Sequence, residues 1–165
     1  MSDQQIEFCI IPQEISDDLC IEFQLKQDSK FSQYRDSSSI QIANTCEPMV
    51  FGNVVGDGNC LYRAVSLSIS GTQDNHKKLR EKTATELHMN RRNFAYIAEE
   101  KIDGLIHSAL LDGAFGEDAW GEESHLIALS VALRIRIYLF NRLWTPPQWE
   151  TISADLNSNC VPVQV

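Results

Sequence analysis

Apolar residues recur four positions apart in residues 60–70, a spacing typical of one face of a helix. Leu61, Val65 and Ile69 form this stripe, with polar or small residues between them. Gly71 follows directly, and glycine is the residue that most often ends a helix because it adopts the left-handed conformation without strain. The pattern predicts a helix that begins near residue 60 and ends at residue 70.

A second amphipathic pattern covers residues 72–92, where His76, Leu79, Thr83 and Leu87 share one face. Thr72, Asp74 and Asn75 precede that face, and such side chains are typical helix N-caps. Two shorter helical patterns follow in residues 94–102 and 104–111, and we expect Asp103-Gly104 to separate them.

The periodicity changes from helical to alternating near residue 134. Residues 122–133 are strongly apolar, follow a Trp120-Gly121 pair and predict a buried helix. In residues 134–140, Ile135, Ile137 and Leu139 alternate with Arg136 and Tyr138, which is strand spacing. Residues 145–148 then predict a turn and residues 149–152 a further strand. Helices followed by strands indicate an α/β or α+β domain with helices on a small sheet.

The first 50 residues lack such a period, and we expect them to form a separate N-terminal extension. Short apolar pieces alternate there with a polar stretch from Lys26 to Ser39. This composition predicts a region that is loosely ordered, or docked through a short strand or helix. The predicted organisation is an extension over residues 1–50 and a domain over residues 51–165.

Charge and cysteine content restrict the possible partners. The formal net charge is −9, and no basic stripe is present, which argues against nucleic acid or an anionic membrane as partner. No apolar run approaches the roughly 18 residues of a membrane span. The five cysteines are odd in number, form no C-x-x-C pair and follow no secretory signal. We therefore expect an intracellular, cytoplasmic protein with reduced cysteines.

The sequence Gly56-Asp57-Gly58-Asn59-Cys60 stands immediately before the first predicted helix. It lacks the third small residue of a dinucleotide fingerprint, the Lys-Ser/Thr of a P-loop and the alternating oxygen ligands of an EF-hand. A cysteine at a helix N-terminus favours the thiolate, and flanking glycines free backbone N–H groups to bind an oxyanion. The same pattern also suits a tight turn with a buried, inert cysteine.

Residues 56–66 resemble the signature of the ovarian-tumour (OTU) cysteine proteases, which are deubiquitinases. The likeness continues through residues 76–87 and 120–141 in the family's order. It implies a papain-like OTU fold, with a small central sheet packed between helices, and no metal or cofactor. It also implies that Cys60 is the nucleophile, that Asp57 belongs to the active site, and that backbone N–H groups of residues 57–60 hold the oxyanion.

The family's general base is a histidine on a strand near the end of the domain, and its position here is unknown. Four histidines are available. We expect a core or capping role for His76 and surface positions for His88 and His107, whereas His125 lies where relatives commonly carry glutamate. No histidine follows His125, so the resemblance predicts C-terminal strands that are missing, a degenerate domain, or a base improvised from His125 or His107.

Two principal hypotheses of function follow. The first is a thiol protease that hydrolyses isopeptide or peptide bonds after the Gly-Gly end of ubiquitin, with ubiquitin or ubiquitin-conjugated proteins as partners. Its activity depends on how the missing histidine is supplied. The second is an inactive OTU-like pseudoprotease that binds ubiquitin or another protein. A redox-sensing role for Cys60 is a third hypothesis.

Overall fold

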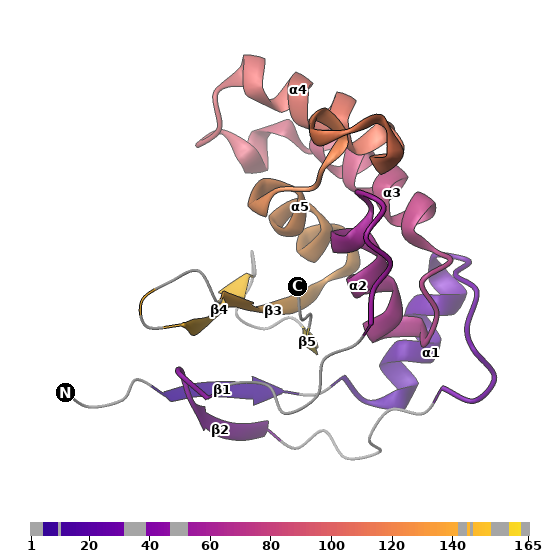
Figure 1. Cartoon of the computed structure of the whole chain (residues 1–165), viewed down its shortest axis with the longest axis vertical. Coiled ribbons are helices and arrows are strands. Elements are labelled where there is room, and N and C mark those ends of the chain that lie inside the picture. Colours follow the sequence, from indigo (N-terminus) through magenta and orange to yellow (C-terminus); the bar gives the residue numbers. More distant parts are fainter. Residues whose placement is uncertain are drawn as a thin grey trace.

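The computed structural model describes residues 5–9, 11–31, 39–46, 53–141, 145, 147–152 and 159–162. Helices form its upper and right-hand parts, and short strands its lower part (Figure 1). In chain order the helices and strands are β1 (Gln5–Cys9), α1 (Gln13–Glu22), β2 (Ser39–Ala43), α2 (Cys60–Ser70), α3 (His76–Met89), α4 (Glu99–Leu110), α5 (Glu123–Leu133), β3 (Ile135–Asn141), β4 (Gln148–Ile152) and β5 (Asn159–Pro162). Three short 3-10 segments, η1 (Arg91–Phe94), η2 (Gly113–Phe115) and η3 (Glu117–Ala119), connect the helices.

The strands of the described residues form two sheets. In the larger sheet β3 is central, antiparallel to β4 and parallel to β5. Ile137 faces Ile152 in the register of β3 with β4. β1 and β2 pair antiparallel as a separate ribbon. The arrangement confirms the predicted α+β class.

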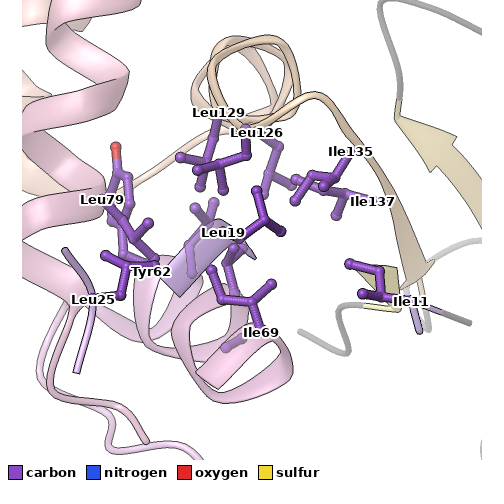
Figure 2. Packing of buried hydrophobic residues seen from close by; sticks show 14 of the residues in the cluster. Ile11, Leu19, Leu25, Tyr62, Ile69, Leu79, Leu126, Leu129, Ile135 and Ile137 are labelled. Carbon is purple, nitrogen blue, oxygen red and sulfur yellow. The ribbon is translucent and has the colours of Figure 1, made fainter. Parts of the chain in front are cut away.

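One face of β3 completes the main hydrophobic core. Ile135 and Ile137 are 1% and 0% exposed and pack against α2 and α5. Figure 2 shows side chains of α1, α2, α3, α5 and β3 converging on this core. Its labelled members are Ile11, Leu19, Leu25, Tyr62, Ile69, Leu79, Leu126, Leu129, Ile135 and Ile137.

The other face of β3 is covered by the β1–β2 ribbon. Tyr138 and Phe140 are buried there with Trp149, and Ile6 and Ile42 of the ribbon pack against them. The Tyr138 hydroxyl donates a hydrogen bond to the Glu7 carbonyl oxygen (3.0 Å). β3 is thus buried on both faces, whereas the alternation in the sequence had assigned Tyr138 to the polar side.

The helices predicted within residues 60–70, 72–92 and 122–133 are confirmed as α2, α3 and α5, but the break at Asp103-Gly104 is wrong. α4 runs unbroken through both residues. A glycine within a helix costs about 1 kcal/mol relative to alanine. Burial of one face of α4 offsets that cost, through Ile102, Leu105 and Ala109.

The N-terminal residues that the structure describes contribute to the main core. Leu19 and Cys20 of α1 are each 5% exposed, and Ser16 donates a hydrogen bond to the Ile69 carbonyl oxygen of α2. Asn75, predicted as a helix cap, makes no side-chain cap. Its side-chain amide instead exchanges two hydrogen bonds, each of 2.8 Å, with the backbone of Lys26. Residues that the sequence had assigned to an extension therefore pack against α2 and bond to Asn75, just before α3.

Candidate active site

Cys60 is the first residue of α2, and its side chain is exposed. Leu61, Val65 and Ile69 bury the opposite side of the helix, which turns position 60 outward. Gly71, with φ of 73°, ends the helix as predicted. The N–H groups of a helix's first turn have no partner within the helix, and they carry the positive end of its dipole. This is the environment that stabilises a thiolate.

Asp57 has a structural side chain. Its carboxylate forms a bidentate salt bridge with Arg63, whose Nη2 atom donates to Oδ2 (2.6 Å) and whose Nε atom donates to Oδ1 (3.0 Å). The hydrogen bond from Arg63 holds the pKa of the Asp57 carboxyl far below its usual range. A carboxylate that stays ionised at all working pH values neither donates nor accepts a proton in catalysis. Any direct contribution of Asp57 to the reaction comes from its backbone.

Asp57 also fixes the loop that precedes the helix. Its Oδ1 atom accepts a hydrogen bond from the Asn59 N–H (3.1 Å), a local turn that aspartate commonly forms. The Asn59 N–H is therefore engaged and drops out of the predicted set of oxyanion donors. In the described part of the chain, no hydrogen bond occupies the N–H groups of Asp57, Gly58 or Cys60. These three remain as candidate donors.

The Asn59 side chain is buried (1% exposed), and both its oxygen and its nitrogen are hydrogen-bonded. Its Oδ1 atom accepts from Arg80 Nε (2.7 Å) and from the Gly113 N–H (3.0 Å). Its Nδ2 atom donates to Asp112 Oδ1 (3.0 Å). The residue before the nucleophile candidate is thus tied to α3 and to the segment after α4.

Two glycine backbones meet behind this loop. A Cβ atom on Gly58 would lie 2.2 Å from the Gly113 carbonyl oxygen, and one on Gly113 would lie 2.2 Å from the Gly58 carbonyl carbon. Gly58 also has φ of 78°, which side chains disfavour. Gly56 differs, because a Cβ there would meet no atom within 4 Å. The second glycine of the motif is needed for packing, and the first leaves the approach open.

The histidines do not supply a base in this structure. His125 is 1% exposed, accepts from the Glu122 N–H at Nδ1 (3.0 Å), and lies 3.0 Å from the Leu105 carbonyl oxygen through Nε2. Since Nδ1 accepts, Nε2 carries the proton and donates, which is the neutral imidazole. Burial lowers the pKa of His125 and favours that neutral form. An imidazole used in this way is not free to take a proton from a thiol.

The other three histidines match their predicted positions. His76 is 8% exposed at the start of α3, with Nδ1 3.0 Å from the Gln73 carbonyl oxygen. His88 on α3 and His107 on α4 are exposed. Sequence reasoning left the general base unassigned, and the described residues do not assign one.

Arg80 was not predicted as a site residue, but it is 3% exposed on α3 and contacts the loop directly. A signal was present: Arg80 stands four residues after His76 and three before Thr83, on the face of the helix that is otherwise buried. A charged residue at such a position is rarely buried without several hydrogen bonds. Arg63 carried a weaker signal, since it lies on the polar side of α2.

Comparisons with known proteins place this site in context. The family described as "OTU-like cysteine protease" matches residues 55–161. The mouse protein "OTU domain-containing protein 1" is 34% identical over 87 residues, which cover 53% of this chain and 18% of that protein. The Arabidopsis thaliana "OVARIAN TUMOR DOMAIN-containing deubiquitinating enzyme 7" is 26% identical over 96 residues, covering 58% of this chain and 24% of that protein.

A solved structure, that of the OTUD1 OTU domain, superposes with a TM-score of 0.54 at 28% identity. The superposed region covers 68% of this chain and 76% of the chain in the OTUD1 structure. This chain spans about a fifth of the length of the curated relatives it matches. None of the helices in the described residues is long and apolar enough to cross a membrane.

Proposed function

Because the chain belongs to the OTU-like cysteine protease family, we propose that it acts on ubiquitin conjugates through Cys60 as a thiol nucleophile. The observation that carries the proposal is the exposed Cys60 side chain on the first residue of α2. In the same loop are the N–H groups of Asp57, Gly58 and Cys60, which form no hydrogen bond with any residue that the structure describes. The Arabidopsis relative is named as a deubiquitinating enzyme, which supports the substrate class.

The proposed reaction has two steps. The Cys60 thiolate adds to the carbonyl carbon of the C-terminal glycine of ubiquitin, and the carbonyl oxygen becomes an oxyanion held by the loop N–H groups. The carbon–nitrogen bond then breaks, the leaving amine takes a proton, and a thioester to Cys60 remains. Water hydrolyses the thioester to a free ubiquitin carboxylate and restores the thiol. Each oxyanion donor typically contributes a factor of about 10² to 10³ in rate.

The proton transfers need a general base and acid, which contribute a factor of about 10² to 10⁴. His125 is excluded from this role in the present arrangement, because both of its ring nitrogens are hydrogen-bonded and it is 1% exposed. This observation favours a second candidate function, a pseudoprotease that binds ubiquitin without cleaving it. Both candidates share the binding step, and they differ in whether turnover follows.

The test uses ubiquitin with an electrophilic alkyne at its C-terminus and detection of the adduct by intact mass. We expect one adduct, located at Cys60 by peptide mapping and lost in Cys60→Ala. Cys46→Ala is the matched control, because Cys46 is also an exposed thiol but does not begin a helix. Its adduct yield should equal that of the wild-type chain.

Cleavage of di-ubiquitin then separates the two candidates. An adduct together with cleavage supports the protease, and an adduct without cleavage indicates a reactive thiol without its general acid. Ubiquitin binding by Cys60→Ala with no adduct in the wild type supports the pseudoprotease. A chain that neither reacts with nor binds ubiquitin refutes both.

A further inference from the structure

The peptide group between Gly58 and Asn59 is held at both ends, immediately before Cys60. Its carbonyl oxygen, on Gly58, accepts a hydrogen bond from Arg80 Nη2 (3.1 Å). Its N–H, on Asn59, donates to Asp57 Oδ1 (3.1 Å). Arg63 in turn holds the Asp57 carboxylate. The carbonyl thus points to the buried guanidinium of Arg80, away from the exposed side of the loop.

Arg80 makes a set of contacts that only a planar, forked cation could make. Besides Gly58, it donates from Nε to Asn59 Oδ1 (2.7 Å), from Nη1 to the Ser108 carbonyl oxygen (3.0 Å), and from Nη2 to the Ala119 carbonyl oxygen (2.7 Å). Its Cζ atom lies 4.5 Å from the centroid of the Tyr62 ring. One side chain therefore joins the loop, α4 and η3 in a fixed geometry. Lysine has one nitrogen and cannot replace these contacts.

The contacts of Arg80 are not those of a simple ion pair. All four hydrogen-bond acceptors named above are neutral carbonyl or amide oxygens. Removing a cation from water is costly, and burial lowers the pKa of the Arg80 guanidinium. The carboxylates of Asp112 and Asp57 attract the Arg80 charge, but no hydrogen bond to a carboxylate compensates its burial, which makes Arg80 a poor source of stability. It is a good device for fixing backbone oxygens in one orientation.

The orientation matters because Gly58 is the position at which this peptide could rotate. Rotating the 58–59 peptide group changes ψ of Gly58 and φ of Asn59. Glycine has no Cβ atom to restrict ψ at its positive φ of 78°, so the rotated peptide lacks the steric barrier that a side chain would impose. Rotation would turn the carbonyl oxygen toward the side of the loop that carries Asp57 and the free N–H groups. A carbonyl oxygen there would repel the oxyanion that the proposed reaction forms.

We propose that Arg80 is a positioning residue that keeps the Gly58 carbonyl turned inward and so keeps the oxyanion site beside Cys60 free. The proposal rests on the proposed function in one respect, the role of Cys60 as nucleophile. It makes the orientation of the Gly58 carbonyl depend on a side chain 22 residues further along the chain. Arg80 itself touches no reacting atom.

The experiment compares two probes in Arg80→Lys and Arg80→Met. Ubiquitin aldehyde adds the Cys60 sulfur to its carbonyl carbon, the thiol proton passes to the oxygen, and the hemithioacetal oxygen occupies the oxyanion site. Iodoacetamide alkylates the same sulfur with loss of iodide and forms no oxyanion. We expect the affinity for ubiquitin aldehyde to fall about 100-fold in Arg80→Met and at least about 10-fold in Arg80→Lys. Alkylation of Cys60 should change less than about threefold.

Arg91→Met is the matched control, because Arg91 forms its ion pairs with Glu99 and Asp103 at the surface. It should match the wild type with both probes. Circular dichroism and thermal melting identify the variants that remain folded. Ubiquitin affinity measured in the Cys60→Ala background, with and without Arg80→Lys, should be equal, which assigns the loss to the oxyanion and not to binding.

Three outcomes overturn the proposal. The first is a folded Arg80→Met variant that binds ubiquitin aldehyde as tightly as the wild type. The second is a variant in which the affinity for ubiquitin aldehyde and the rate of alkylation by iodoacetamide fall equally, which indicates general loosening of the loop. The third is an Arg80 Nε–H signal in the NMR spectrum of the wild type that exchanges as fast as an exposed arginine. That last measurement needs no variant and no ubiquitin. It therefore still tests whether the Arg80 guanidinium is held against the loop if the variants do not fold, or if the wild type fails to react and the proposed function is refuted.

Discussion

Replacing Gly113 with alanine should slow the reaction of Cys60 with ubiquitin probes, although Cys60 itself is unchanged. A Cβ atom on Gly113 would lie 2.2 Å from the Gly58 carbonyl carbon, 2.4 Å from its oxygen and 2.6 Å from the Asn59 nitrogen. All three atoms belong to backbone, so no flexible side chain can move aside. Gly113 does not have a positive φ, so alanine is compatible with its backbone and the effect is steric alone.

The size of the effect follows from these distances. Ordinary contacts of a Cβ atom begin near 3.4 Å, so the two segments must separate by about 1.2 Å. Overpacking of this kind typically costs about 1–3 kcal/mol of stability. A shift of about 1 Å in a reacting group can reduce the rate about 100-fold. We therefore expect a Gly113→Ala variant that melts about 2–12 °C lower and forms the ubiquitin adduct at least about 10-fold more slowly.

Gly104→Ala provides the matched control. Gly104 lies within α4, and a Cβ there would meet no atom within 4 Å. Alanine should stabilise the helix by about 0.5–1 kcal/mol and leave the rate of adduct formation unchanged. Differential scanning fluorimetry and time-resolved mass spectrometry of the adduct measure both quantities. If Gly113→Ala reacts and melts like the wild type, the contact between the two glycines does not hold the loop and the reasoning is wrong.

Three further predictions concern charge and anchoring. The pKa of the Asp57 carboxyl is lowered in the folded state, so its contribution to stability is present above about pH 4 and is lost on acidification. Asp57→Asn should reduce the free energy of unfolding by about 1 kcal/mol at pH 7. Urea titrations should show this difference shrinking below pH 4. Burial lowers the pKa of His125, so the unfolded chain takes up the proton first and the free energy of unfolding falls as the pH drops below about 6.5. His125→Gln should reduce this loss of stability between pH 7.5 and 5.5 and leave the rate of Cys60 adduct formation within about threefold. Loss of the adduct in this variant would restore His125 as a base. Tyr138→Phe removes the hydrogen bond to the Glu7 carbonyl oxygen and should cost about 1 kcal/mol, with faster amide exchange in β1; unchanged exchange would show that the hydrogen bond does not anchor the ribbon.

The sequence predicted those elements whose own residues determine them. The four-residue spacing of Leu61, Val65 and Ile69 defines α2 and its buried face. Gly104 misled because a glycine in an exposed position of a long helix is tolerated when the opposite face is buried. The roles of α1 and of the β1–β2 ribbon could not be predicted, since they depend on contacts between residues more than 40 positions apart, such as Ser16 with Ile69.

The same distinction holds for the site. Position and exposure of Cys60 followed from a local pattern, the glycine loop and the helix after it. The use of the Asn59 N–H by Asp57 is also local, and the turn propensity of aspartate could have revealed it. The contacts of Arg80 and Gly113 with the loop join residues at least 21 positions apart. A single sequence carries no record of such pairs beyond the presence of an arginine on a buried helix face.

The hydrogen bonds of α1 and Asn75 determine how far the chain can be shortened at its N-terminus and still fold. The matched family region begins at residue 55, yet Ile11 and Leu19 are 0% and 5% exposed within the core that α2 and α5 share. A fragment starting at residue 55 would open that core to solvent on the side of Ile69. We expect the two parts to melt in one cooperative transition, and we expect the shortened fragment to aggregate when the full chain stays dispersed.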